Sequence, residues 1–197
     1  MFVTFEGLDG SGKSTQAELL AQALRADGRD VIETREPGGT PLGEQIRELL
    51  LNGRDMSAWA EAALFAAARA ELVERIIAPA LEAGKDVVCD RYIDSSLAYQ
   101  GIARDLGVDR VLELNLNATQ GLLPDRTVLV LVDPETALAR TGARDRIESE
   151  SERFHRAVDS AYRSLATMFP NRIMTVDGSQ PPAEIAEQIR GRLRELS

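Results

Sequence analysis

One segment near the N-terminus has the residue types and the spacing of a phosphate-binding loop (P-loop). Residues 7–14 are Gly-Leu-Asp-Gly-Ser-Gly-Lys-Ser and match Gly-x-x-x-x-Gly-Lys-Ser/Thr, between an apolar run and a helical pattern. Glycines allow N–H groups to turn toward phosphate oxygens, and the positive end of the next helix adds to the attraction. Lys13 can reach the β- and γ-phosphates, and the Ser14 hydroxyl can bind Mg²⁺. The segment therefore predicts a site for a nucleotide with Mg²⁺.

A second polar segment directly follows the apolar run 87–89, at the predicted carboxyl end of a strand. Open α/β sheets bind their ligands at this edge. Asp90 is placed to bind Mg²⁺ directly or through water, and Arg91 can hold a phosphate with two parallel hydrogen bonds. We therefore expect part of a phosphate site here; a structural Asp–Arg ion pair at the start of a loop is the alternative.

Side chains that could bind a flat ligand recur at a spacing of four residues. If the segment from 94 onward is helical, Ser96 and Gln100 share one face and can hydrogen-bond to the edge of a base, with Tyr99 on a neighbouring face. In an Ala-rich stretch earlier in the chain, Phe65 and Arg69 can present an aromatic ring and a planar cation to one ligand. Taken alone, a Phe on such a helix is more often part of the core.

The elements that must position these residues alternate along the chain. Short β-branched apolar runs alternate with longer amphipathic segments, which is typical of βα units on a parallel sheet. We predict strands at 2–6, 30–34, 86–89, 126–132 and 172–176, and helices at 13–27, 41–51, 58–83, 94–104, 108–118, 134–141, 150–168 and 181–196. The first, third and fourth strands are almost continuously apolar, so we expect them at the centre of the sheet.

Composition narrows the class of protein. The 197 residues are 44% hydrophobic and 28% charged and contain no repeat or linker, which predicts one globular domain spanning 1–197. A net charge of −9 argues against a nucleic-acid polymer as partner. No apolar run approaches the ~20 residues of a membrane span. A single cysteine, Cys89, fits a reducing compartment, so we expect a soluble cytoplasmic protein.

Three segments together resemble those of bacterial thymidylate kinases. They are the P-loop, the run Arg35-Glu36-Pro37-Gly38-Gly39-Thr40 and the stretch 90–101, and the resemblance spans the chain. It implies an α/β fold with a five-stranded parallel sheet flanked by helices on both faces. It also implies an enzyme, usually a homodimer, that transfers the γ-phosphoryl group of ATP to dTMP with Mg²⁺, giving dTDP and ADP.

The resemblance also implies roles for individual residues. Phe65 would stack on thymine, Tyr99 would crowd the 2′ edge of the sugar, and Asp9 would lie near the 3′-hydroxyl and the metal. The residues implied to bind dTMP are Asp9, Arg47, Phe65, Arg69, Arg91, Ser96, Tyr99 and Gln100. Those implied to bind ATP are Gly7, Leu8, Asp9, Gly10, Ser11, Gly12, Lys13, Ser14 and Thr15, with Ser14 and Asp90 on the metal.

An arginine-rich stretch around Gly142 resembles the mobile lid of this family, at about 141–150. Arg140, Arg144 and Arg146 lie in or beside it. Bacterial members of the family place the catalytic arginine in this lid, whereas another class carries a basic residue at the variable P-loop positions. Positions 8–11 carry no basic residue here, so the resemblance implies that the lid supplies the catalytic charge. The residues expected to act in catalysis are Lys13, Arg91, Arg144 and Arg146. A phosphate acceptor is already mostly anionic at pH 7, so the single histidine, His155, is not required as a base.

Two alternatives remain from the sequence. A P-loop kinase for another small acceptor, such as a different nucleoside monophosphate or a nucleoside, would share the loop but not the base-reading residues. A nucleotide-dependent switch or ATPase would hydrolyse ATP without dTMP and form no phosphorylated nucleotide. A GTP switch is disfavoured because the chain contains no Asn-Lys-x-Asp string.

Overall fold

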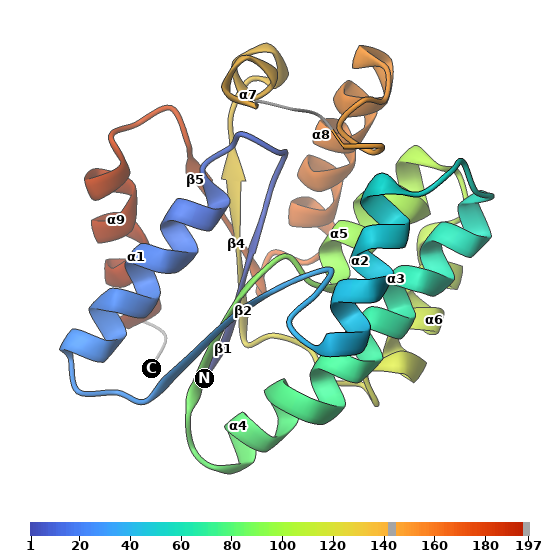
Figure 1. Cartoon of the computed structure of the whole chain (residues 1–197). Coiled ribbons are helices and arrows are strands. Elements are labelled where there is room, and N and C mark those ends of the chain that lie inside the picture. Colours follow the sequence, from blue (N-terminus) through green and yellow to red (C-terminus); the bar gives the residue numbers. More distant parts are fainter. Residues whose placement is uncertain (142–144, 195–197) are drawn as a thin grey trace.

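Five parallel strands form a single sheet in the order β2-β3-β1-β4-β5 (Figure 1). The computed structural model describes residues 1–141 and 145–194. The strands are β1 (Phe2–Glu6), β2 (Val31–Arg35), β3 (Asp86–Asp90), β4 (Arg126–Leu131) and β5 (Ile173–Asp177). Each predicted strand is confirmed to within one residue at either end. The three most apolar strands, β1, β3 and β4, are at the centre, as predicted.

The register of the central strands brings the two polar segments together. Phe5 of β1 pairs with Asp90 of β3, and Glu6 pairs with Leu129 of β4. The P-loop starts directly after β1, and Arg91 directly follows β3. Since the strands are parallel, both segments leave the sheet at the same edge.

Two helices cover one face of the sheet. Helices α1 (Lys13–Ala26) and α9 (Pro182–Arg194) lie side by side on it in Figure 1. Residues such as Leu20 and Ile189 pack there against Val3 and Phe5 of β1, which point to this face because alternate strand residues face opposite ways. This layer fixes the start of α1, and with it the end of the P-loop.

The remaining helices lie mainly on the other side of the sheet. They are α2 (Pro41–Asn52), α3 (Ala58–Leu72), α4 (Ala78–Glu82), α5 (Ile93–Ser96), α6 (Val108–Ala118), α7 (Pro134–Arg140) and α8 (Glu152–Met168). Two stretches predicted as plain α-helix contain π-helical turns, Val73–Ile77 between α3 and α4, and Leu97–Ala103 after α5. Such widened turns often occur at functional sites.

Side-chain caps fix where several of these helices begin. Ser57 accepts a hydrogen bond from Ala60 N at the start of α3, and Thr40 accepts one from Gly43 N at the start of α2. The predicted start of the last helix at the Pro181-Pro182 pair is confirmed to within one residue, while its predicted end at 196 lies outside the described residues. Within the described ranges, no helix is long and apolar enough to span a membrane.

Candidate active site

The P-loop has the backbone conformation that phosphate binding needs. Gly10 and Gly12 have φ of 80° and 94°, in the left-handed region that glycine adopts without strain. A Cβ at Gly10 would lie 2.1 Å from the carbonyl oxygen of Ala137, so a larger residue does not fit there. The start of α1 has no side-chain cap and no acidic residue in its first turn. Its first N–H groups are therefore free of side-chain competition for an anion.

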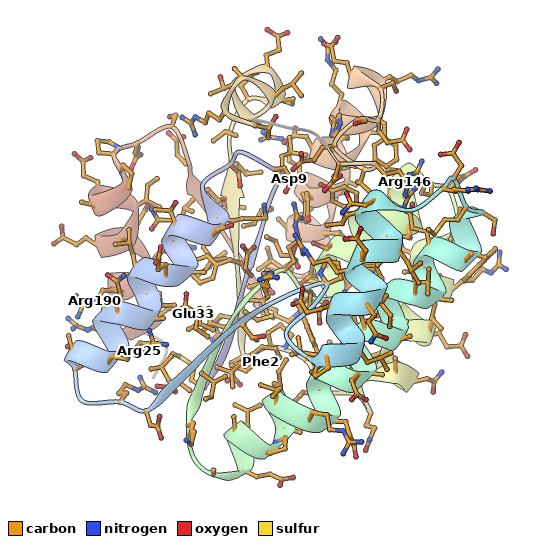
Figure 2. The ribbon with its side chains drawn as sticks, viewed as in Figure 1. Phe2, Asp9, Arg25, Glu33, Arg146 and Arg190 are labelled. Carbon is orange, nitrogen blue, oxygen red and sulfur yellow. The ribbon has the colours of Figure 1, made fainter. Side chains whose placement is uncertain are left out.

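Asp9 joins the two cations expected at the phosphates. Its Oδ1 lies 2.9 Å from Lys13 Nζ and 2.6 Å from Arg91 Nη2. Burial would raise the pKa of Asp9, but the positive charges of Arg91 and Lys13 outweigh it and hold that pKa well below its usual range. Asp9 is therefore ionised at neutral pH and fixes both cations at the mouth of the loop. In Figure 2 it lies at the same end of the molecule as Arg146, opposite to Phe2.

A cavity of about 220 Å³ opens beside this charge cluster. It lies at the carboxyl edge of the sheet, between the P-loop, α2, α3 and the segment that follows β3. Predicted site residues that line it are Asp9, Lys13, Ser14, Arg47, Phe65, Asp90, Arg91, Ser96, Tyr99 and Gln100. The structure thus brings the two predicted phosphate sites and the predicted base-reading residues around one cavity.

Ser14 and Asp90 fit the expected metal site. The Ser14 hydroxyl donates a hydrogen bond to Asp90 Oδ2, while Asp90 Oδ1 is buried and has no hydrogen-bond partner. Within the described part of the chain, no group of three or more His, Cys, Asp or Glu side chains could form a metal site. Mg²⁺ usually keeps several waters and binds one or two carboxylates together with nucleotide phosphates. An unpartnered carboxylate oxygen beside a P-loop hydroxyl meets that requirement.

An Asp90→Asn variant tests this metal assignment. We expect the Mg²⁺ concentration for half-maximal activity to rise by roughly 10- to 100-fold, because a neutral amide replaces the unpartnered carboxylate. The measurement is the initial rate of phosphoryl transfer as a function of the free Mg²⁺ concentration, at a saturating concentration of nucleotide. Glu135→Gln, a change to an exposed carboxylate on α7, is the control and should not shift the curve. An unchanged Mg²⁺ requirement in Asp90→Asn would remove Asp90 from the metal site.

Arg91 is held in a strained conformation that directs it to the cavity. Its φ of 70° lies in the left-handed region, which a non-glycine residue adopts only at a cost. Its Nη1 donates to Ser95 Oγ at 3.0 Å and to Tyr162 OH at 3.1 Å, while Nη2 is at Asp9. Arg47 faces the cavity from α2, and its Nη1 donates to Pro37 O at 2.9 Å. Two guanidinium groups can therefore meet a phosphate on the side away from the P-loop.

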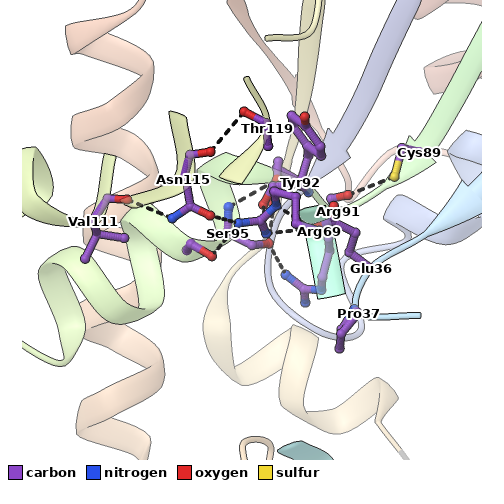
Figure 3. Close-up of polar contacts among 12 residues, drawn as sticks. Glu36, Pro37, Arg69, Cys89, Arg91, Tyr92, Ser95, Val111, Asn115 and Thr119 are labelled. Atoms are coloured by element: carbon purple, nitrogen blue, oxygen red, sulfur yellow. Dashed lines mark hydrogen bonds and ion pairs between the residues drawn. The ribbon is translucent and has the colours of Figure 1, made fainter. Parts of the chain in front are cut away.

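Arg69 lies behind the cavity wall. Its side chain is 1% exposed, and its donors are used by Glu36, Ser96, Asn115 and the Tyr92 carbonyl (Figure 3). It is not among the residues that line the cavity. In this conformation Arg69 holds the Ser96 hydroxyl in place and does not face a ligand itself. The spacing of Phe65 and Arg69 indicated a shared helix face, but spacing does not show which partners a long side chain finds.

The three lid arginines have different positions. Arg146 is docked on α2 and α3, where Nη2 lies 2.7 Å from Glu61 Oε2 and Nε donates to Leu50 O at 2.8 Å. Arg140 reaches the P-loop, with Nη1 3.5 Å from Gly10 O. Arg144 lies outside the described residues. Of the described lid residues, the cavity is lined by Asp145, Ile147 and Glu148.

Glu6 is a buried site residue that sequence reasoning missed. Its Oε1 accepts hydrogen bonds from the backbone N–H groups of Tyr92 and Ser95, and its Oε2 accepts from the hydroxyls of Ser95 and Tyr162. It thereby fixes the two side chains to which Arg91 donates. A carboxylate as the last residue of a central, otherwise apolar strand, directly before the P-loop, was the available signal.

Glu6 makes stability depend on pH. Burial, aided by the charge of Asp94, raises the pKa of Glu6 from 4.5 to about 7. The folded protein then keeps a proton that the unfolded chain releases, so the free energy of unfolding should fall as pH rises from about 4.5 to about 7. We expect this fall to be on the order of 2–3 kcal/mol larger in the wild type than in Glu6→Gln. Urea unfolding of both proteins at about pH 5 and pH 8 measures this fall. If the free energies of unfolding of wild type and Glu6→Gln differed by the same amount at both pH values, the assignment would be contradicted.

The fold and the cavity together define a class of protein. An all-parallel five-stranded sheet carries a P-loop at its carboxyl edge, and a cavity beside that loop is lined by arginines and by base-sized aromatic and polar groups. This is the architecture of a P-loop kinase for a small acceptor.

Comparisons with known proteins identify the family. A sequence profile described as thymidylate kinase matches residues 5–189. The chain is 52% identical over 198 residues to a thymidylate kinase of Leifsonia xyli subsp. xyli, covering 98% of this chain and 94% of that one. It is 49% identical over 189 residues to one of Synechococcus sp. (strain JA-2-3B'a(2-13)), covering 96% and 92%. The crystal structure of thymidylate kinase from Ehrlichia chaffeensis superposes with a TM-score of 0.82 at 33% identity, covering 98% of both chains. The chain belongs to the thymidylate kinase family.

Proposed function

We propose that this protein transfers the γ-phosphoryl group of ATP to dTMP, giving dTDP and ADP for dTTP synthesis. The observation that carries the proposal is one cavity shared by the P-loop lysine Lys13, the arginines Arg47 and Arg91, and base-sized side chains. Membership of the thymidylate kinase family supports the same reaction.

ATP binds in this proposal with its phosphates on the P-loop. The residues assigned to it are Gly7, Leu8, Asp9, Gly10, Ser11, Gly12, Lys13, Ser14 and Thr15. Ser14 and Asp90 would hold Mg²⁺, which when bound would neutralise charge on the phosphates of ATP. The loop after β5 approaches the P-loop closely, since a Cβ at Gly178 would lie 2.9 Å from Ser11 O.

The acceptor dTMP occupies the other side of the cavity. Arg91 and Arg47 bind its phosphate, and Asp9 lies beside the sugar. Phe65 provides a face for the base, and Tyr99 closes the sugar side with a buried hydroxyl that has no hydrogen-bond partner. Ser96 and Gln100 read the edge of the base, and Arg69 acts through Ser96.

The residues around the cavity have a positioning task. The acceptor phosphate has a second pKa near 6 and is already a nucleophile at pH 7, so no general base is needed. The remaining work is to hold two polyanions in line and to neutralise charge that spreads over the transferred group. Lys13, Arg91 and the lid arginines supply that charge. His155 lies on α8, where its ring contacts the Glu148 carbonyl, and has no role in the transfer.

A lid at about 141–150, within one domain spanning 1–197, closes over the substrates. Closure excludes water, which otherwise competes for the phosphoryl group. ATP hydrolysis should therefore be slow in the absence of an acceptor.

A homodimer belongs to the same proposal. Exposed apolar side chains support it, since Leu42 and Leu49 of α2 are 46% and 54% exposed and Trp59 of α3 is 38% exposed. Sedimentation at working concentration tests the oligomeric state. A cytoplasmic location stays a prediction that rests on the lone cysteine.

The experiment is a comparison of acceptors. With Mg²⁺–ATP, the protein is offered dTMP, dUMP, UMP, AMP, GMP and thymidine in turn, and kcat/KM is determined from the phosphorylated product. The proposal expects dTMP to be the best acceptor. A higher kcat/KM for another acceptor would favour a different P-loop kinase and would overturn the base-reading assignments.

A further inference from the structure

Glu61 is a buried carboxylate that no part of the proposed mechanism uses. It lies on α3 and is 1% exposed. Gln100 Nε2 donates to its Oε1 at 2.8 Å, and Arg146 Nη2 donates to its Oε2 at 2.7 Å. Arg104 pairs with the same carboxylate at 3.2 Å. One side chain therefore contacts a base-reading residue and an arginine of the lid.

The ionised form of Glu61 is the stable one. Burial alone would raise the pKa of Glu61, but the hydrogen bonds from Gln100, Arg146 and Arg104 outweigh it and lower that pKa. An ionised carboxylate accepts hydrogen bonds and cannot donate them. Gln100 must therefore present its NH₂ group to Glu61, so chemistry determines the orientation of this amide.

The other end of the amide faces the ligand. Gln100 lines the cavity, and no donor among the described residues reaches its Oε1. Next to it, Ser96 Oγ accepts a hydrogen bond from Arg69 Nη1 at 3.0 Å, which leaves the Ser96 hydroxyl proton for the cavity. The wall thus offers one acceptor, from Gln100, beside one donor, from Ser96.

This pair matches one class of pyrimidine. Thymine and uracil present an N–H donor beside a carbonyl acceptor, which complements a wall acceptor beside a wall donor. Cytosine presents a ring-nitrogen acceptor where thymine and uracil have that N–H, so this acceptor would meet the Gln100 oxygen, which is itself an acceptor. Buried polar groups that are left without a hydrogen-bond partner cost binding free energy, so the site should discriminate strongly against cytosine.

The same carboxylate holds the lid segment. Arg146 is fixed by Glu61, by the hydrogen bond of Nε to Leu50 O, and by its backbone N–H to Leu51 O at 2.9 Å. Arg104 also pairs with Glu150 at 2.6 Å. Glu61 therefore both orients the Gln100 amide and holds the lid in place.

We propose that Glu61 is a positioning residue that selects imide bases by fixing the Gln100 amide with its oxygen toward the cavity, and that it docks the lid through Arg146. The inference rests on the proposed function, because it takes the acceptor base to lie against Ser96 and Gln100.

The test is the Glu61→Gln variant, assayed with dUMP and dCMP, two acceptors that differ only on the base edge in question. A glutamine at 61 can donate as well as accept, so the Gln100 amide can rotate and meet either base. We expect the ratio of kcat/KM for dUMP over dCMP to fall by roughly 10- to 100-fold, mainly through KM. Glu71→Gln, on the same helix but paired with Arg75 and not part of the cavity lining, is the control and should keep the wild-type ratio.

A double variant keeps the test decisive if Glu61→Gln folds poorly. In Glu61→Gln/Gln100→Glu the amide and the carboxylate exchange places, so the carboxylate again presents an acceptor to the base, and the preference for dUMP should return. A wild-type ratio in Glu61→Gln, or no return of the preference in a folded double variant, would overturn the inference. Absence of any phosphorylation of dTMP by the wild type would instead overturn the proposed function.

Discussion

Replacing Arg144 with Ala is expected to lower turnover with dTMP by on the order of a thousandfold, with little change in the KM for dTMP. A lid arginine that stabilises charge on the transferred phosphoryl group acts only in the transition state, so its loss appears in kcat. The P-loop offers no substitute, because positions 8–11 are Leu, Asp, Gly and Ser. Steady-state kinetics in dTMP at saturating Mg²⁺–ATP measures the effect.

The matching change at Arg146 combines an effect on the chemistry with an effect on lid docking. Arg146→Ala is also expected to lower turnover, and here the structure supplies a second cause, since the ion pair with Glu61 is lost. Arg156→Ala, at an exposed position on α8, is the control and should be close to wild type. Wild-type turnover in both Arg144→Ala and Arg146→Ala would remove the lid from the mechanism.

The second large effect is expected at Lys13. Lys13→Ala should lower kcat by about 10²–10³-fold, because a buried, pre-positioned cation at the β- and γ-phosphates is lost. Lys13 is 6% exposed, and its Nζ lies 2.9 Å from Asp9 Oδ1. The position of the lysine is therefore set before ATP binds. Initial rates with dTMP, together with a thermal unfolding midpoint, measure the change.

Lys85→Ala is the natural control for that variant. Lys85 is at the opposite edge of the sheet and pairs at 2.9 Å with Asp30. It should retain wild-type turnover. A Lys13→Ala protein that folds normally and turns over dTMP within a few-fold of wild type would contradict the P-loop assignment.

The sheet and the site edge could be predicted because their signals are local. Strands buried on both faces are continuously apolar, and this placed β1, β3 and β4 at the centre correctly. The P-loop spacing and the polar residues after β3 then had to share one edge, since parallel strands end together. The spacing of four residues placed Ser96 and Gln100 on one face, and the family resemblance supplied the roles of Phe65 and Tyr99; all four line the cavity.

The charge network could not be predicted, because it depends on contacts between distant segments. The guanidinium of Arg69 donates hydrogen bonds to Glu36 and Asn115, which are 33 and 46 residues away in the sequence. Arg69 therefore lies behind the cavity wall. Glu6 and Glu61 are buried carboxylates whose partners come from distant segments. Those of Glu6 come from the segment after β3 and from α8, and those of Glu61 come from residues 100–104 and from Arg146. Periodicity places such residues on a face but does not name the groups that meet them.

The central claim is phosphoryl transfer from ATP to dTMP at the shared cavity. The most direct measurement follows ³¹P NMR spectra of the protein with Mg²⁺–ATP, with and without dTMP. The account predicts equal amounts of ADP and dTDP in the presence of dTMP, and little inorganic phosphate in its absence. Release of inorganic phosphate at the same rate in both samples, with dTMP unchanged, would contradict it and would favour a nucleotide-dependent ATPase.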